Sequence, residues 1–190
     1  MPSLVLLAGS LRRSSLNARL AHALAGLAPE DWDCAVATPA GIPLYDGDAE
    51  EAEGIPPAVA ALKERIAAAD GLVLVTPEYN QGVPGVLKNT IDWLSRPPRD
   101  IGRVLRGRPV ALCGASPSPV GTRTAQYAWL PTLRGLGMQQ WAGGSLFVGS
   151  AGDAFDADGD LADPELRRRA EAFITDFGRW AAARQRLAAE

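Results

Sequence analysis

Apolar segments of strand length alternate with amphipathic segments along this chain, and that alternation constrains its fold more than any other feature. Runs rich in Val, Leu and Ala lie at residues 4–8, 35–37, 72–75, 110–113 and 145–148. Segments with apolar residues at helical spacing lie at residues 17–27, from 56 onward, at 84–94, at 123–135 and from 163 onward. Strands that alternate with helices form parallel sheets with right-handed crossovers. The pattern therefore predicts an α/β fold, a doubly wound five-stranded parallel sheet with helices on both faces.

The chain has the size and composition of one globular domain. Its 190 residues are 47% hydrophobic, and no linker, repeat or low-complexity stretch divides them, so we expect a single domain over residues 1–190. Residues 38–54 are rich in Pro, Gly and Asp and are expected to form a loop. No apolar run reaches the roughly 18 residues of a membrane span, and the N-terminus lacks the basic leader of a signal peptide. Two cysteines, Cys34 and Cys113, give no disulfide framework, which favours a cytoplasmic protein.

Net charge and the scarcity of some residue types argue against several functions. Nineteen basic and 22 acidic residues give a net charge of −3, which argues against a dedicated nucleic-acid binder. His22 is the only histidine, so metal sites that need two histidines are excluded and a Ser-His-Asp triad is disfavoured. Cys113 lies in a predicted buried strand without a neighbouring base, which favours an inert thiol. Residues 154–165 have a calcium-loop pattern, but Ala154 replaces its first carboxylate, so no metal site is expected.

The predicted sheet indicates where a ligand would bind. In such sheets the ligand lies beyond the carboxyl ends of the strands, at the point where the strand order reverses. The loops that follow the first, third and fourth predicted strands span residues 9–17, 76–84 and 114–123. We therefore expect these three loops to form the site.

The first loop has the composition of an anion site. Its polar side chains are Ser10, Arg12, Arg13, Ser14, Ser15 and Asn17. The amides and the positive dipole end of the following helix add to their attraction for an anion, so we favour phosphate binding. The alternative is a capped helix start, with Ser14 or Ser15 as the N-cap and Asn17 incidental. The loop has neither G-x-G-x-x-G nor G-x-x-x-x-G-K-[ST], which indicates a mononucleotide such as FMN.

The second and third loops are consistent with a ligand but do not require one. Two prolines and two glycines within residues 76–85 constrain a loop that presents backbone amides to a planar heterocycle. The alternatives are that Tyr79 packs against the fold and that Glu78 caps a helix or forms a salt bridge. Residues 114–123 are small and polar, and the alternative there is a flexible connection.

At these loops the sequence resembles the NADPH-dependent FMN reductase family, which includes bacterial quinone, chromate and azo-dye reductases. Gly9-Ser10-Leu11-Arg12-x-x-Ser15-x-Asn17 is similar to the family's phosphate loop. A second segment resembles the most diagnostic stretch of the family: Thr76-Pro77-Glu78-Tyr79-Asn80 through Pro84-Gly85-x-Leu87-Lys88-Asn89-x-Ile91-Asp92-Trp93-x-Ser95-Arg96-Pro97. The similarity in order and spacing extends from residue 3 to about residue 180.

The resemblance implies a flavodoxin-like oxidoreductase with FMN and NADPH or NADH as cofactors. Its electrons would pass to a quinone, azo compound, metal oxyanion or free flavin, and a homodimer or homotetramer is implied. The resemblance assigns the FMN phosphate to Ser10, Arg12, Ser15 and Asn17, with Leu16 also cofactor-binding. The resemblance also implies that the isoalloxazine ring is lined, mostly by backbone groups, by Pro77, Glu78, Tyr79 and Asn80. Ser116 would lie near the pyrimidine side of the ring. The helix used for packing or dimerisation would carry Lys88, Asn89, Asp92 and Trp93. No catalytic residue is assigned, because the cofactor carries the hard chemistry.

The chain departs from the family pattern at two places, and two rival functions stay open. The third loop has Gly121-Thr122-Arg123 where the family often has Gly-Gly-x-Arg, and Pro131 should kink or shorten the helix at 123–135. Both departures lie where nicotinamide or substrate would approach. One rival is a flavodoxin-type electron carrier that does not oxidise NAD(P)H. The other is a hydrolase that uses Ser10 or Ser116, disfavoured because His22 lies outside the three loops.

Overall fold

A computed structural model describes residues 1–189 and contains one parallel sheet. Its strands are β1 (Ser3–Ala8), β2 (Asp33–Ala37), β3 (Gly71–Val75), β4 (Pro109–Ala115), β5 (Gln139–Gln140) and β6 (Leu146–Val148). The strand order is β2-β1-β3-β4-β5, with β6 also paired to β4. Because β3 takes the other edge of β4, β5 and β6 are two pieces of one interrupted fifth strand. The predicted parallel α/β sheet is confirmed, with this interruption as the difference.

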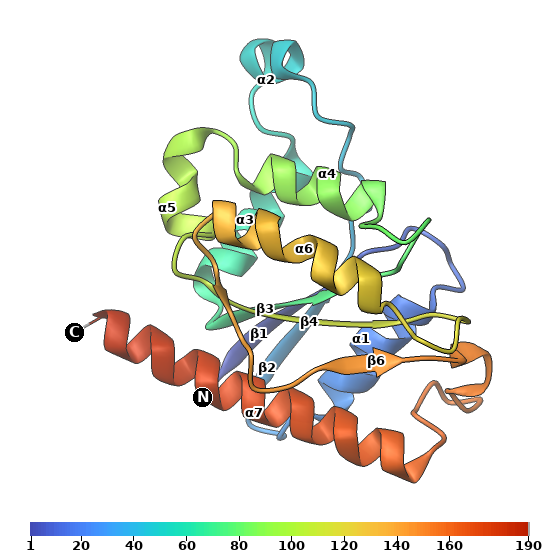
Figure 1. The fold of residues 1–190 in the computed structure, drawn as a ribbon. Helices are drawn as coiled ribbons and strands as arrows, with labels where there is room; N and C mark the ends of the chain where they lie inside the picture. The colour runs from blue at the N-terminus through green and yellow to red at the C-terminus, as the bar shows by residue number, and fades with distance from the viewer. Residues whose placement is uncertain (190) are drawn as a thin grey trace.

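Helices cover both faces of the sheet, as Figure 1 shows. The longer helices are α1 (Leu16–Leu27), α3 (Pro57–Ala68), α4 (Gly85–Leu94), α6 (Arg123–Gly135) and α7 (Pro164–Ala189). Successive residues of β1 alternate between two cores. Leu4, Leu6 and Ala8 pack on the side of α1 and α7, whereas Val5 and Leu7 pack on the side of α3, α4 and α6. This two-sided burial explains why the strands read as continuous apolar runs.

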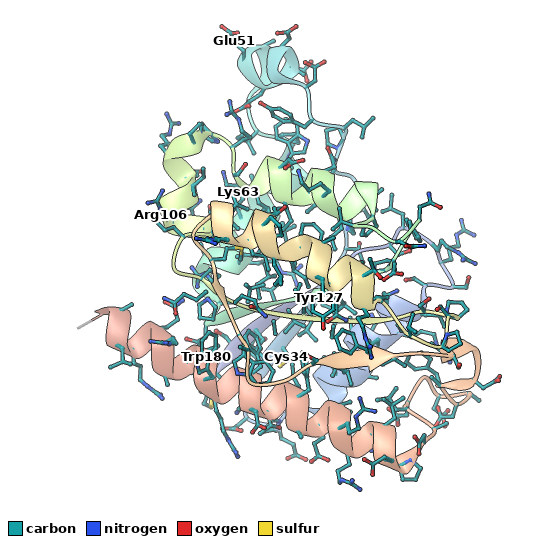
Figure 2. All side chains as sticks on the ribbon, viewed as in Figure 1. Cys34, Glu51, Lys63, Arg106, Tyr127 and Trp180 are labelled. Carbon is teal, nitrogen blue, oxygen red and sulfur yellow. The ribbon has the colours of Figure 1, made fainter. Side chains whose placement is uncertain are left out.

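The structure corrects the expectation that residues 38–54 form only a loop. They include the helix α2 (Gly47–Glu53), which begins where the Asp46 carboxylate accepts hydrogen bonds from the N–H groups of Asp48 and Ala49. We define the arm as residues 43–54. Figures 1 and 2 show it projecting from the layered body, with Glu51 near its tip. No apolar face marked this helix in the sequence, because none of its residues is buried.

The connection between α4 and β4 also contains unpredicted helical turns. These are the short helix α5 (Ile101–Val104) and a 3₁₀ turn at Pro98–Asp100; another such turn lies at Ala151–Asp153. Pro131 does not shorten α6, which continues to Gly135. The reason is its position: Pro131 is exposed, while Trp129 and Leu133 on the buried side hold the helix to the core. Along residues 1–189 no helix has both the length and the apolar character needed to cross a membrane.

Two of the four helix residues expected to serve packing or dimerisation, Asn89 and Trp93, hold the arm in place. The Asn89 side-chain amide and the Trp93 indole N–H both donate to the Pro43 carbonyl, at 2.8 and 2.9 Å. The Tyr45 N–H donates to the Asn89 side chain at 2.8 Å, and the Tyr45 ring meets Trp93 edge-on with ring centroids 5.0 Å apart. The α4 helix therefore fixes the base of the arm.

Candidate functional site

The three expected loops follow the carboxyl ends of β1, β3 and β4 (Figure 1). Residues of all three loops line one cleft. The cleft has a volume of about 290 Å³. Its walls are formed by Ser10, Arg12, Ser14, Ser15, Leu16, Asn17, Pro77, Glu78, Tyr79, Ala115, Ser116 and Pro117. Nine of the ten residues assigned to cofactor binding are in this wall; the tenth, Asn80, is not. The residues that sequence reasoning did not assign are Ser14, Ala115 and Pro117, each next to an assigned residue.

The start of α1 forms one end of the cleft. Ser15 is the N-cap, and its hydroxyl oxygen accepts from the Ala18 N–H at 3.1 Å, as the alternative interpretation expected. A hydroxyl that accepts one bond can still donate its own proton. Within the described chain, the N–H groups of Leu16 and Asn17 make no hydrogen bond. Arg12 and Ser14, both exposed, are in the same cleft wall as Leu16 and Asn17. This end of the cleft therefore presents several donors and one cation.

Asn17 connects the first and third loops. Its buried side-chain amide donates to the Ala115 carbonyl at 2.9 Å and accepts from the Ala115 N–H at the same distance. Both polar groups of that side chain thus bond to the end of β4. Asn17 is not incidental, and the pairing is a role that sequence position alone did not reveal, because its partner lies 98 residues away.

The second loop is attached to α6 through Glu78. The Glu78 carboxylate accepts from the N–H of Ala125, in the first turn of α6, at 2.9 Å. The helix-capping alternative for Glu78 is therefore confirmed. The Glu78 side chain is therefore bound to α6, and Pro77, Glu78 and Tyr79 line the cleft.

A tight two-residue turn follows Glu78. The Tyr79 N–H donates to the Gly82 carbonyl at 3.2 Å and the Gly82 N–H donates to the Tyr79 carbonyl at 3.0 Å. Between them, Asn80 and Gln81 both have left-handed backbones, with φ of 51° and 60°. Positive φ at both central positions is typical of a type I′ turn. Asn80 thus lies at the turn, outside the cleft wall, whereas Tyr79 is half-exposed within it.

Neither cysteine has the character of a nucleophile. Burial, with a smaller contribution from Asp33, raises the pKa of Cys34 to about 11, and burial also raises the pKa of Cys113. Both groups therefore stay protonated at neutral pH. His22 lies on the exposed side of α1 and lines a different hollow. Within residues 1–189 no three His, Cys, Asp or Glu side chains gather to hold a metal ion.

The donor set of the cleft fits FMN. The phosphate of FMN is an anion, and the start of α1 gathers free N–H groups, hydroxyls and the Arg12 cation. The planar ring needs an apolar wall with backbone hydrogen-bonding groups, and Pro77, Tyr79 and Pro117 supply that character on the facing loops. FMN supplies hydride and electron transfer when it is bound, so the chain itself needs no nucleophile, no pair of histidines and no metal cluster.

The fold and the position of this cleft define a flavodoxin-like α/β protein with its ligand site at the carboxyl ends of the strands. The chain is similar in structure to FerB of Paracoccus denitrificans, a flavoenzyme NAD(P)H:(acceptor) oxidoreductase, with a TM-score of 0.87 and 30% sequence identity. The match covers 97% of this chain and 99% of FerB. A WrbA-like flavodoxin of Agrobacterium tumefaciens shares the fold at 17% identity, with a TM-score of 0.60 over 97% of this chain and 99% of its own.

The sequence comparisons give the family. The model of the NADPH-dependent FMN reductase family matches residues 2–153. An NAD(P)H-dependent FMN reductase of Pseudomonas aeruginosa is 43% identical over 161 residues, 85% of each chain. A 2-hydroxy-1,4-benzoquinone reductase of a Burkholderia species is 38% identical over 172 residues, 90% of this chain and 92% of that one. The chain belongs to the NADPH-dependent FMN reductase family. It is an oxidoreductase that uses FMN and NAD(P)H, as the resemblance implied.

Proposed function

We propose that FMN binds in the cleft between the three loops and that the protein reduces quinones with electrons from NAD(P)H. The phosphate end would contact Ser10, Arg12, Ser15, Leu16 and Asn17, mainly through hydroxyl, guanidinium and backbone N–H donors. The ring would lie along Pro77, Glu78, Tyr79 and Asn80, with Ser116 at its far edge. The observation that carries this proposal is the group of unpaired donors at the start of α1, Leu16 N–H, Asn17 N–H and Arg12, in the same cleft wall as Pro77 and Tyr79.

Each part of the chain has a separate task in this proposal. The start of α1 binds the anionic end and fixes the cofactor along the cleft. The Asn17–Ala115 pair and the Glu78–Ala125 bond hold the three loops at constant spacing. The open side of the cleft admits the nicotinamide and then the acceptor, which is consistent with a reaction in which donor and acceptor use one site in turn.

A quinone is the acceptor that the exposed apolar side chains of the three loops favour. Each loop exposes a large apolar or aromatic side chain: Leu11 is 57% exposed, Tyr79 47% and Val120 51%, and Tyr79 is in the cleft wall. Such side chains stabilise a planar apolar molecule more than a hydrated metal oxyanion. The Burkholderia relative is named for a benzoquinone, which supports the same acceptor class. Azo compounds, metal oxyanions and free flavin are the alternatives.

We also propose that residues 1–190 form one FMN-binding domain that acts in the cytoplasm as a homodimer or homotetramer. Two free cysteines support the reducing compartment. The arm supports an assembly, because its Leu44 side chain is 82% exposed to solvent.

Arginine variants test the cofactor site. Arg12 and Arg13 are adjacent and both exposed, but only Arg12 is in the cleft wall. We expect Arg12→Ala to raise the dissociation constant for FMN roughly 10- to 100-fold, because a hydrogen bond to a charged group contributes about 1.5–3 kcal/mol. Arg13→Ala removes the same charge but leaves the cleft wall intact, so we expect it to change the dissociation constant for FMN less than about threefold. Titration of the apoprotein with FMN measures both, and equal effects would refute the site.

Steady-state kinetics with the FMN-loaded protein test the activity. We expect NADPH or NADH consumption that depends on added benzoquinone, with kcat/KM higher for the quinone than for an azo dye, chromate or free FMN. A flavin that stays oxidised under excess NADPH and NADH would instead support the electron-carrier alternative. A protein that binds no FMN would revive the hydrolase.

A further inference from the structure

Thr76 is the first residue of the second loop. It follows β3, is fully buried, and is not in the cleft wall. Its N–H donates to the Cys113 carbonyl at 2.8 Å, which extends the pairing of β3 with β4 by one residue. Its carbonyl is packed so closely against Gly114 that a Cβ there would lie 2.1 Å from the carbonyl oxygen. The backbone of Thr76 is therefore held firmly just before the chain enters the cleft.

The Thr76 hydroxyl has two partners that fix the direction of its own proton. Its oxygen lies 3.1 Å from the indole nitrogen of Trp129 and 2.9 Å from the Pro77 carbonyl oxygen. An indole N–H only donates and a carbonyl only accepts. The hydroxyl must therefore accept from Trp129 and donate to Pro77, so the Pro77 carbonyl is held toward the buried hydroxyl.

That direction determines where the next N–H points. The Pro77–Glu78 peptide bond is trans, and in a trans peptide the C=O and N–H point in opposite directions. A carbonyl held toward Thr76 thus turns the Glu78 N–H away from the core, and in the described residues this N–H makes no hydrogen bond. The Glu78 carboxylate is meanwhile fixed to the Ala125 N–H. The peptide is held at both ends by α6, because Ala125 and Trp129 lie one turn apart on its buried side.

We propose that Thr76, supported by Trp129, is a positioning residue that aims the Glu78 N–H into the cleft as a hydrogen-bond donor to the flavin. The inference rests on the proposed FMN site. A donor that faces the ring stabilises the more electron-rich reduced form over the oxidised form. Thr76 therefore affects both the affinity for FMN and its reduction potential without touching the cofactor.

The substitution Thr76→Val tests this role, because valine has nearly the same shape but lacks the hydroxyl. Thr90→Val is the matched control: Thr90 is also fully buried, and its hydroxyl donates only to the Val86 carbonyl within α4. We expect Thr76→Val to weaken FMN binding about fivefold, the effect of one neutral hydrogen bond. The affinity ratio of reduced to oxidised FMN should also fall about fivefold, which lowers the two-electron midpoint potential by about 20 mV. Thr90→Val should leave affinity and potential as in the wild type.

A second variant separates positioning from folding. Trp129→Phe removes the indole donor but leaves the Thr76 hydroxyl next to the Pro77 carbonyl, so we expect a potential between those of the wild type and Thr76→Val. A wild-type potential in Thr76→Val would overturn the positioning role even if its melting temperature falls. If Arg12→Ala fails to weaken FMN binding, the cofactor site itself is wrong. If Arg12→Ala weakens binding and Thr76→Val leaves the potential unchanged, only the positioning role is wrong.

Discussion

Single residues at the base of the cleft set how closely its loops approach each other. Gly9 is packed against Pro77 and Leu87, where a Cβ would lie 2.9 and 2.6 Å from their side-chain carbons. Gly114 is even closer to its neighbours, with the Thr76 carbonyl oxygen 2.1 Å and the Thr122 hydroxyl 2.3 Å from such a Cβ. Any side chain at Gly114 would therefore push β3 and β4 apart at the floor of the site.

Gly114→Ala and Gly26→Ala should have opposite effects on stability. We expect Gly114→Ala to lower the free energy of unfolding by about 1–3 kcal/mol, as overpacking does, and to weaken FMN binding, because Thr76 must move. Gly26 is exposed within α1 and has open space around it. Gly26→Ala should raise the unfolding free energy by about 0.5–1 kcal/mol. Urea unfolding of the apoproteins measures both; a neutral Gly114→Ala would show that the sheet can yield here.

Asn17 and Glu78 show how far prediction extends at this scale. The family resemblance assigned both to the cofactor site, and both are in the cleft wall. The side chains of Asn17 and Glu78 bind backbone groups of Ala115 and Ala125, which are far away in the sequence. No residue type in the sequence marks a backbone partner, so these contacts depend on the tertiary structure.

Among the elements, the segment between α4 and β4 is held by two buried cations. Lys63 on α3, labelled in Figure 2, donates to the Arg96 carbonyl and to the Asp100 carboxylate, the latter at 2.5 Å. Arg108 donates to carbonyls at the ends of two helices, Ala67 and Ala69 near the end of α3 and Arg103 and Val104 in α5. Each cation satisfies carbonyl groups that a helix end leaves unpaired.

The Lys63–Asp100 pair should contribute more to stability than an exposed pair. Asp100→Asn leaves the buried ammonium without its counter-charge, so we expect a loss of about 2–3 kcal/mol in unfolding free energy. Asp92→Asn is the control, since Lys88 and Asp92 form an exposed pair one turn apart on α4, with an expected loss of about 0.3–0.5 kcal/mol. Denaturant unfolding at pH 7 compares the two, and equal losses would contradict a special role for the buried pair.

Lowering the pH should reduce the stability difference between the wild type and Asp100→Asn. The hydrogen bond from Lys63 holds the pKa of Asp100 below its ordinary value. A carboxylate with a lowered pKa stabilises the fold above its ordinary pKa, and the contribution is lost as the pH falls through the folded-state pKa. The gap in stability between the wild type and Asp100→Asn should therefore shrink below about pH 4.

At the scale of the whole molecule, the arm is the part that the layered fold does not explain. It is anchored through Pro43 and Tyr45 to α4 and through a 2.7 Å ion pair between Glu50 and Arg96. An anchored segment that keeps Leu44 in water suggests a surface that another subunit would cover.

Leu44→Asp tests the proposed assembly. We expect it to shift the protein toward the monomer in sedimentation velocity, because a carboxylate in an apolar contact is costly. Leu187→Asp is the control, since Leu187 is 64% exposed near the end of α7, away from the arm. A wild-type protein that is monomeric at micromolar concentration, or a Leu187→Asp variant that dissociates equally, would contradict assembly through the arm.

The sequence by itself determined the parallel α/β sheet and the loops that form the cleft, because apolar periodicity and strand-end loops are local signals. The motifs in those loops carried the resemblance to the family. The helix α2 was missed because it buries no apolar face, and the interruption of the fifth strand was missed because its two pieces are only two and three residues long. Only the tertiary structure decided which groups face the cleft. The Asn17–Ala115 pair, the Glu78 cap and the Thr76–Trp129 bond join residues 47 or more positions apart. Chain folding brings such partners together, and no local pattern encodes them.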